Sequence, residues 1–370
     1  MKLHLIRETL LKPLEQVIGV VERKQTLPIL SNVLLSTENK LLSITGTDLE
    51  VELIGQTKLG NENLEASRFT LPGRKLIDIC RALPKNAPIE LHGDKEKIIF
   101  RSGQSCFVLS TLPADHFPTV EKLEYYLKLT LPQYQLYRLL QRTYFSMAQQ
   151  DVRSYLNGLL LEMRPTKLRA VATDGHRLAS QLFEIDTSIK HQLQVIFPRK
   201  GVIELLRLLT DNENPVTLMI GKNHVSVSTI DFTFTSKLIK GRFPDYERVI
   251  PKGGTKQITI DRDLFKQALS RTAILLYNEK FKGIRFELRH GLLRILSTNS
   301  EQEVAEEVIK IDYSKEELDI GFNVNYLLDI LNIVERGNVI LTFSDSNSSL
   351  LVTEAKNRIE SIFVVMPMRL

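Results

Sequence analysis

The chain has 370 residues, of which 43% are hydrophobic and 25% are charged, as in ordinary folded proteins of two or three domains. The N-terminus has no apolar core and no run of eighteen apolar residues occurs, so we expect neither export nor a membrane span and predict a cytoplasmic protein. The formal charge of +5 permits contact with a polyanion without requiring it. Two cysteines, Cys80 and Cys106, without a Cys or His pattern nearby, argue against a metal site or a redox motif.

A segment of eleven residues recurs three times, at intervals of about 125 residues. In each copy an apolar stretch leads into a threonine followed by Asp or Asn. The copies span residues 42–52, 168–178 and 293–303. A repeat of this length is a globular domain and not a solenoid unit.

The same series of predicted elements surrounds each copy. An amphipathic helix is followed by an apolar strand and then by the strand pair that carries the recurring segment. A second helix and two alternating strands close the copy. In chain order, helices are predicted around residues 10–18, 76–83, 136–140, 202–209, 264–269 and 326–331, apolar strands at 29–35, 156–161 and 281–286, and final strands at 107–110, 232–235 and 362–365.

These elements predict an α+β fold of three repeated domains, each with an antiparallel sheet and two helices. Similar connectors follow the first two copies, so we expect domains at residues 1–122, 123–251 and 252–370. Tandem domains with similar connectors suggest one repeated head-to-tail contact, which generates a ring when it closes. Twelve inward-facing helices from two chains, each roughly 10 Å wide, would leave a hole of roughly 28 Å.

Five motifs in register with the repeat carry a family resemblance. They are TLPIL at 26–30, GTDLE at 46–50, TDGHRL at 173–178, GRFPDY at 241–246 and VMPMRL at 365–370. Together, and over the whole chain, they resemble the bacterial DNA sliding clamps, the β subunit of DNA polymerase III. The resemblance implies the DNA clamp fold, a ring-shaped homodimer that encircles duplex DNA without reading its sequence. It also implies a processivity factor that has no catalytic residue or cofactor and binds the clamp loader, DNA polymerases and other clamp-binding proteins.

The resemblance also implies roles for three sets of residues. DNA contacts are expected at Lys24, Gln150, Arg153, Tyr155, Arg199 and Lys200. A peptide cleft between the second and third domains is expected at Leu156, Thr173, Gly175, His176, Arg177, Leu178, Pro244, Arg248, Val249, Asn323, Tyr326, Ser349, Val364, Val365, Met366, Pro367, Met368, Arg369 and Leu370. The dimer interface is expected at Phe107, Leu109, Ile274, Leu275, Glu301 and Glu303.

The end of the chain suits a surface that binds several partners. Met366 and Met368 flank Pro367, which cannot continue a regular sheet, and methionine side chains repack readily around different ligands. A buried terminal strand is the alternative. Basic residues on the predicted helices, such as Arg142 and Arg207, favour DNA binding, because a sliding ring needs many weak phosphate contacts. Solvated helix faces are the alternative for these residues.

Asp174 and His176 resemble an acid–base pair, since a carboxylate beside an imidazole can orient it for catalysis. The other copies carry Glu50 and Glu301 in place of the histidine, while the Asp or Asn persists. We therefore interpret the shared residue as a turn former that bonds its own backbone. A nucleotide-processing or nuclease enzyme and a monomeric protein-binding scaffold remain the competing functions.

The chain departs from the family pattern in several places. Its net charge is basic, and Gln104 and Cys106 stand where arginines are expected on an interface strand. Ion pairing with Glu301, Glu303, Glu306 and Glu307 across the interface is therefore expected to be thin. Gln25 and Asn347 replace other residue types, and the segment around Tyr277 is one residue longer.

Overall fold

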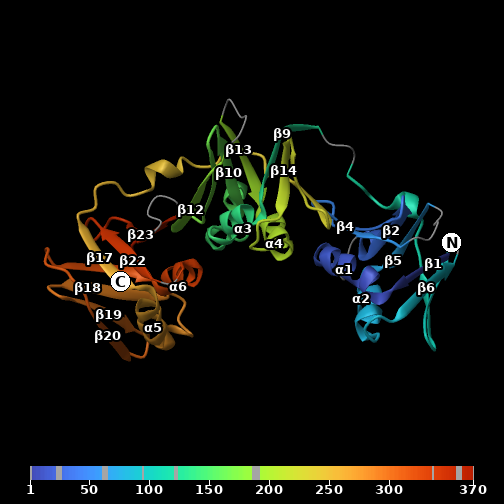
Figure 1. Cartoon of the computed structure of the whole chain (residues 1–370). Coiled ribbons are helices and arrows are strands. Elements are labelled where there is room, and N and C mark those ends of the chain that lie inside the picture. Colours follow the sequence, from blue (N-terminus) through green and yellow to red (C-terminus); the bar gives the residue numbers. More distant parts are fainter. Residues whose placement is uncertain are drawn as a thin grey trace. The chain divides into compact units, whose positions relative to one another are not determined.

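The computed structural model describes residues 2–21, 27–60, 66–93, 96–120, 124–185, 192–335, 337–355 and 361–369 (Figure 1). Lys24, Gln25 and Leu370 lie outside these ranges. Contacts divide the chain into two compact units, the first made of Met1–Tyr134 with Ile203–Leu238 and the second of Gln135–Val202 with Ile239–Leu370. The second repeat copy contributes to both units.

The first unit holds one eight-stranded and one four-stranded sheet. In sheet order, the larger contains β5 (Ser67–Pro72), β2 (Asn32–Glu38), β3 (Leu41–Thr47), β4 (Val51–Lys58), β16 (Phe232–Lys237), β15 (His224–Ser228), β14 (Pro215–Gly221) and β9 (Tyr125–Pro132). The smaller contains β1 (Lys2–Ile6), β6 (Pro88–Gly93), β7 (Lys97–Ser102) and β8 (Ser105–Ser110). Helices α1 (Arg7–Val17) and α2 (Gly73–Ala82) pack against each other.

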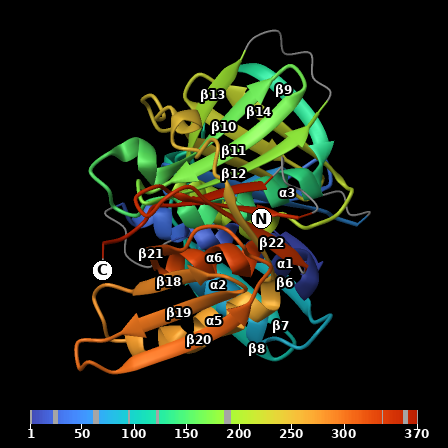
Figure 2. The same cartoon turned by 90° about the vertical axis from the view of Figure 1, so that its left-hand side faces the viewer.

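The second unit repeats this arrangement. Its larger sheet contains β13 (Leu193–Pro198), β10 (Gly158–Arg164), β11 (Lys167–Thr173), β12 (Arg177–Glu184), β24 (Ser361–Val365), β23 (Leu350–Glu354), β22 (Asn338–Phe343) and β17 (Lys256–Asp261). Its smaller sheet contains β20 (Val304–Lys310), β19 (Leu292–Thr298), β18 (Gly283–Arg289) and β21 (Leu318–Asn323). Strands β18, β19 and β20 run side by side in the lower part of Figure 2. Helices α5 (Arg262–Thr272) and α6 (Val324–Ile333) pack together, whereas α3 (Gln133–Gln141) and α4 (Arg199–Leu208) each contain residues of both units.

Helix starts and the aromatic core explain why the third copy folds as it does. Asp261 accepts hydrogen bonds from two backbone N–H groups at the start of α5, and such a cap satisfies donors that have no partner inside the helix. Beneath the helices, the rings of Phe286 and Phe322 lie 5.5 Å apart between centroids, and Phe265 and Phe343 extend the cluster on either side. All four side chains are buried, so they form the apolar layer between helices and strands.

Strand order confirms the threefold repeat. The second to fifth strands of each copy are ordered β5-β2-β3-β4, β13-β10-β11-β12 and β21-β18-β19-β20. The first strand and the last three are ordered β1-β6-β7-β8, β9-β14-β15-β16 and β17-β22-β23-β24. Within the described residues, every copy contains two α-helices and the strand pairs are antiparallel. The predicted fold class, three repeated α+β domains, is therefore confirmed.

The details of the strands differ from the sequence pattern. The pattern indicates five strands per copy, whereas the structure has eight. The sequence pattern does not predict strands β1 and β5, because each passes directly into a helix, at Ile6–Arg7 and Pro72–Gly73. No turn therefore separates the apolar spacing of the strand from that of the helix. The apolar strands also begin later than predicted, because 3-10 turns occupy Pro28–Ser31 and Ser154–Asn157 before β2 and β10.

Arg142 is not part of a solvated or DNA-facing helix surface. Its side chain is only 6% exposed. The guanidinium donates to Glu354 Oε2 at 2.6 Å, to Ser361 Oγ at 2.7 Å and to Glu335 Oε1 at 2.9 Å. A buried charge needs such partners because leaving one uncompensated in the interior is costly. The residue therefore ties the end of α3 to the strands of the third copy.

We expect Glu354→Gln to lower the free energy of unfolding of the second unit by about 3 kcal/mol, because the Arg142 guanidinium would lose its buried counter-charge. Urea unfolding followed by circular dichroism measures the change. Glu316→Gln is the matched control, because Glu316 pairs with Lys256 at the surface and its side chain is 81% exposed. Equal unfolding midpoints for the two variants would show that the buried pair contributes nothing.

Candidate functional site

The Thr-Asp segment forms a side-chain-bonded turn in the first two copies. Asp174 Oδ1 accepts hydrogen bonds from the backbone N–H groups of His176 at 2.9 Å and Arg177 at 3.0 Å. Asp48 Oδ1 accepts equivalent bonds from Glu50 and Val51 at 2.9 and 2.7 Å. The interpretation of the shared residue as a turn former is confirmed.

The third turn contains one extra residue. Asn299 Oδ1 accepts from the N–H groups of Glu301 at 3.1 Å and Glu303 at 2.9 Å, while Gln302 takes a left-handed φ of 65°. The Asn299 N–H therefore donates to the carbonyl of Glu303, four residues on. In the first copy, the Asp48 N–H donates to the carbonyl of Val51, only three residues on. The simple alignment of 293–303 with the other copies is wrong by one residue after the turn, since a looped-out residue leaves no trace in the flanking apolar pattern.

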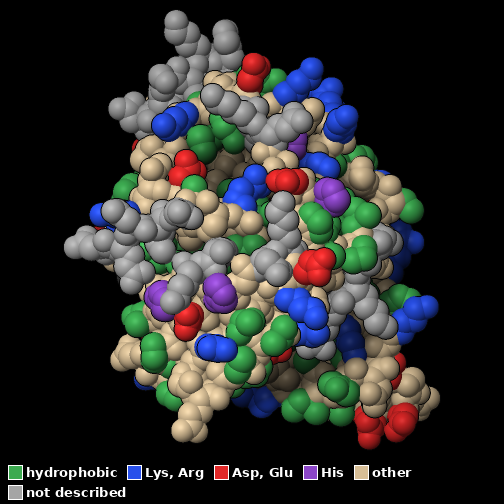
Figure 3. All heavy atoms as spheres, turned by 90° about the vertical axis from the view of Figure 1, so that its right-hand side faces the viewer, with side chains coloured by type: hydrophobic (Ala, Val, Ile, Leu, Met, Phe, Trp, Pro, Cys, Tyr) green, Lys and Arg blue, Asp and Glu red, His purple; other side chains and the backbone are tan. Residues whose placement is uncertain are grey.

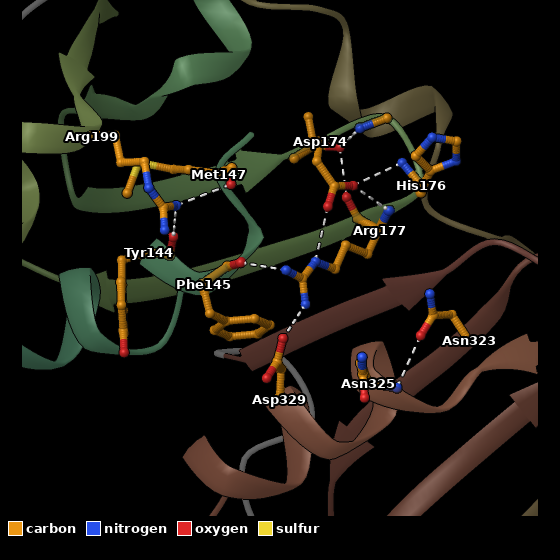
Figure 4. A network of polar contacts seen from close by, with 12 residues as sticks. Tyr144, Phe145, Met147, Asp174, His176, Arg177, Arg199, Asn323, Asn325 and Asp329 are labelled. Atoms are coloured by element: carbon orange, nitrogen blue, oxygen red, sulfur yellow. Dashed lines mark hydrogen bonds and ion pairs between the residues drawn. The ribbon is translucent and has the colours of Figure 1, made fainter. Parts of the chain in front are cut away.

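Arg177 is bonded on every side (Figure 4). Its guanidinium donates to Asp174 Oδ2 at 3.0 Å, to Asp329 Oδ2 at 2.5 Å and to the carbonyl of Phe145 at 2.6 Å. The guanidinium carbon lies 4.6 Å from the ring centre of Tyr326 and 5.4 Å from that of Phe145. Charge-assisted bonds and stacking hold this side chain in one orientation. Burial, together with the nearby Asp174, raises the pKa of Tyr326.

Asp329 is a site residue that sequence reasoning missed. It lies on α6 three positions after Tyr326, so both side chains share one helix face toward Arg177. That spacing was the available signal, but it says nothing about which distant arginine the face meets.

A pocket of about 320 Å³ opens beside this turn. It is lined by Arg153, Tyr155, Leu156, Thr173, Gly175, Arg177, Pro244, Val249, Val364 and Met366. Eight of these ten were expected in a peptide cleft, and the other two, Arg153 and Tyr155, were expected to contact DNA. Leu156 and Val364 are buried and form the floor, whereas Val249 and Met366 are more than 40% exposed at the rim.

Other residues expected in the cleft support the pocket from outside its lining. Leu178 is buried beside Val364 in the core beneath the pocket. Asn323 caps α6 by accepting from the N–H of Asn325 at 3.0 Å. Arg248 is exposed and pairs with Asp245 at 2.8 Å, and Ser349 is half-buried.

The C-terminal tail is held by its backbone. Val365, opposite Arg177, is the last residue of β24. Beyond it, Met366 N–H donates to the carbonyl of His176 at 2.9 Å, and Met368 N–H donates to the carbonyl of Gly321 at 2.8 Å. The exposed His176 therefore contributes its backbone. Pro367 is half-buried between the two bonds, and Arg369 is exposed.

The residues that are expected to contact DNA differ in their hydrogen-bond partners and in their exposure to solvent. Arg153 donates from Nε and Nη2 to Asp151 at 3.0 and 2.9 Å, and these bonds lower the pKa of Asp151 to about 2. Arg199 donates to the carbonyls of Met147 at 3.1 Å and of Tyr144 at 3.4 Å. Gln150 is exposed at a left-handed φ of 56°, and Lys200 is half-buried. On the one face that Figure 3 shows, basic side chains are interspersed with acidic and apolar ones.

Two sheet edges carry exposed apolar residues. On β8, Val108 is 60% exposed and Phe107 is 37% exposed, whereas Leu109 is buried in its own unit. On β20, Val304 and Val308 are more than half exposed. The resemblance implied an interface role for Leu109 and named neither Val108 nor Val304, and alternation alone does not show which face of an edge strand is covered.

The expected acidic and aliphatic interface residues lie near β20. Ile274 is 69% exposed and Leu275 is half-buried. Glu301 is exposed, and Glu303 accepts from Asn299 Nδ2 at 2.6 Å. Farther along β20, Glu306 and Glu307 already have partners within the chain, Arg294 and Arg271 respectively.

Within the described ranges, His, Cys, Asp and Glu side chains form no group of three or more that could hold a metal ion. Among the same residues, no helix is long and apolar enough to cross a membrane.

Comparisons with known proteins agree over the whole chain. Models of the DNA polymerase III beta subunit match as its N-terminal domain at residues 1–121, its central domain at 130–245 and its C-terminal domain at 247–369. The Beta sliding clamp of Pseudomonas putida is 55% identical over 366 residues, 98% of each chain, and that of Escherichia coli K12 is 48% identical over 370 residues, 100% of each chain. A crystal structure of the DNA polymerase sliding clamp from Pseudomonas aeruginosa has a TM-score of 0.96 at 52% identity, and that of the Bartonella birtlesii clamp bound to griselimycin has a TM-score of 0.95 at 34% identity, each with complete coverage of both chains. The chain therefore belongs to the family of the DNA polymerase III beta subunit, the bacterial sliding clamps.

Proposed function

We propose that the chain is a cytoplasmic DNA sliding clamp, a non-catalytic homodimeric ring that encircles duplex DNA and tethers polymerases. We propose domains at 1–122, 123–251 and 252–370. The observation that carries the proposal is that two of three equivalent strand edges are paired within the chain. The third pair of edges, β20 and β8, has no strand partner among the described residues.

The repeat supplies the rule for closing the ring. In both eight-stranded sheets, the fourth strand of one copy pairs with the last strand of the next copy, as β4 with β16 and β12 with β24. By the same rule, β20 pairs with β8 of a second chain. Two such contacts close a head-to-tail dimer and cover the edges of β8 and β20, which could otherwise pair with other chains.

The internal junctions also supply the register that we propose for the contact between two chains. At these junctions, Phe234 lies opposite Leu53 and Phe363 lies opposite Ala179. In each copy, a row of four residues lies opposite one another across neighbouring strands, beginning with the strand that starts the copy. The rows are Leu3, Leu91, Phe100 and Phe107 in the first copy, Leu129, Leu218, Val227 and Phe234 in the second, and Ile258, Leu341, Val352 and Phe363 in the third. Phe107 is thus the equivalent of Phe234 and Phe363.

With the extra residue of the third turn included, Ala305 becomes the equivalent of Leu53 and Ala179. Phe107 of one chain then lies opposite Ala305 of the other, Val108 opposite Val304, and Cys106 opposite Glu306. The exposed valines of the two edges would cover each other, which explains why both strands leave them in solvent.

The exposure of Ile274 supports the same contact. At the internal junction, the rings of Phe145 and Phe363 lie 6.2 Å apart. Phe145 and Ile274 each come two residues after a threonine whose hydroxyl bonds a carbonyl of the preceding helix turn. Ile274 is therefore the equivalent of Phe145, and Phe107 of the second chain would cover it.

This register makes one substitution diagnostic. Glu306→Cys would place a thiol opposite the exposed Cys106 of the second chain, and directly opposed residues of an antiparallel pair lie about 4.5 to 5.5 Å apart between Cα atoms, within the range of a disulfide. We expect mild oxidation to convert the variant to a dimer on non-reducing gels and dithiothreitol to reverse it.

Glu307→Cys is the matched control. Its side chain points to the opposite face of β20, so it should remain monomeric on the same gel. Cys80 does not interfere, because it is buried and burial raises the pKa of its thiol to about 12. Cross-linking of the control alone would shift the register by one residue, and no cross-link in either variant would contradict the proposed edge pairing.

The pocket beside Arg177 would hold an apolar side chain of a partner peptide. Its floor is buried and apolar, and Val249 and Met366 at its rim can close over a ligand. We expect Val249→Ala and Met366→Ala each to lower the affinity for a polymerase-derived peptide about 5- to 30-fold. This corresponds to the loss of roughly 1 to 2 kcal/mol of apolar contact. Fluorescence polarisation measures the dissociation constants. Val152→Ala is the control, because Val152 is 99% exposed in the same unit and outside the lining, and an equal loss in this variant would place the peptide elsewhere.

We propose that DNA is held by enclosure, with Lys24, Gln150, Arg153, Tyr155, Arg199 and Lys200 as weak contacts. Asp151 already neutralises Arg153, and two carbonyls occupy Arg199, so strong phosphate binding by these arginines is not expected. Loaded clamps should therefore survive a high-salt wash on nicked circular DNA and leave when the circle is cut. Gel filtration of radiolabelled clamp measures retention, and equal retention on linear DNA would overturn enclosure.

A further inference from the structure

A second pocket, of about 400 Å³, lies in the first unit where β4 pairs with β16. It is lined by Thr47, Leu49, Glu50, Val51, Glu52, Pro118, Thr119, Val120, His224, Thr235 and Lys237. Nothing in the proposed clamp function uses this pocket. Its walls, however, stand at the repeat positions that build the peptide pocket of the second unit.

The correspondence holds for the turn. Thr47 donates to the carbonyl of Val51 at 2.9 Å, as Thr173 does to that of Arg177 at 2.6 Å. Leu49 N–H bonds back to the threonine hydroxyl, as does Gly175 N–H. One side of each pocket is therefore made by the same turn.

The correspondence extends to the opposite walls. Because Phe234 and Phe363 are equivalent, Thr235 and Lys237 occupy the positions of Val364 and Met366. In the connectors, Pro118 follows a buried phenylalanine, as Pro244 does in the second copy. Strand pairing thus builds the same hollow twice from different side chains.

Leu49 gives this hollow an apolar wall at an energetic cost. Its φ is 76°, a left-handed value that is uncommon for a residue with a Cβ, and the equivalent Gly175 has a φ of 90°. The Leu49 side chain is nevertheless 43% exposed. A leucine kept in a strained, exposed position at the mouth of a pocket suggests a ligand that covers it.

The charge of the pocket is reversed relative to its counterpart. Residues 50–52 are Glu-Val-Glu, where 176–178 are His-Arg-Leu. Glu52 is buried and accepts from Val120 N–H at 2.8 Å, and its burial raises its pKa, whereas Glu50 is exposed. The pocket is lined by two carboxylates and one ammonium, that of Lys237. Partial burial, together with the Lys237 charge, lowers the pKa of His224. The lining is therefore net negative when both carboxylates are ionised and His224 is neutral.

We propose that this pocket is a second docking site, specific for a linear peptide with a bulky apolar side chain flanked by basic residues. The apolar side chain packs against Leu49, Val51 and Pro118, and a flanking lysine or arginine pairs with Glu50. The class of ligand is taken from the peptide pocket proposed above, but the two pockets share no residue and can be tested separately. Two pockets of opposite preference on one chain would allow two different partners to bind at once.

The test uses two fluorescein-labelled peptides, Lys-Lys-Leu-Phe-Lys and Glu-Glu-Leu-Phe-Glu, titrated by fluorescence polarisation into the full chain. We expect Leu49→Gly to lower the affinity for the basic peptide at least fivefold, because it removes the apolar wall. The same change should raise the melting temperature of the protein, because it removes the backbone strain. Glu50→Lys should weaken the basic peptide similarly. Neither change should affect the acidic peptide.

Deletion of residues 366–370 provides the reciprocal control. It should leave the basic peptide unaffected and weaken the acidic one, because it removes Met366 from the other pocket. Loss of basic-peptide binding on this deletion, or unchanged binding in Leu49→Gly, would overturn the second site. Failure of the acidic peptide alone would count against the pocket of the second unit and leave this proposal standing.

Discussion

Antiparallel pairing between the fourth strand of one copy and the last strand of the next copy is the contact on which the rest of the structure depends. It joins β4 to β16 and β12 to β24, and it turns pairs of four-stranded sheets into continuous eight-stranded ones. Each pairing satisfies the backbone groups of two edges that would otherwise face solvent. The pockets follow from it, because both lie where such a junction meets the side-chain-bonded turn.

The two junctions are similar in backbone and different in electrostatics. In the second unit, Arg142 and Arg177 both reach carboxylates contributed by the third copy, with Glu354 buried beside one and Asp329 bonded to the other. In the first unit, Val51 stands in place of Arg177. Strand pairing thus sets the shape of each junction, and the side chains around it set which charges a ligand would meet.

The features that could be predicted from the sequence are those that depend on the spacing of residues close together in the chain. The repeat, the six helices and the turn-forming role of Asp174 depend on residues close together in the chain, and all three are confirmed. The extra residue at Gln302, the meeting of Arg177 with Asp329 and the burial of Leu109 depend on pairing between distant segments. Strands β1 and β5 were missed for a local reason, because no turn residues separate a strand from a helix that follows it directly.

The continuous sheets have a consequence for how such a chain evolves and folds. The unit of sequence duplication is one copy of about 125 residues, but each compact unit combines one whole copy with half of the second. A single copy on its own would leave the edges that meet at these junctions without a strand partner. Cooperative folding is therefore expected to follow the sheets and to cross the borders of the repeat.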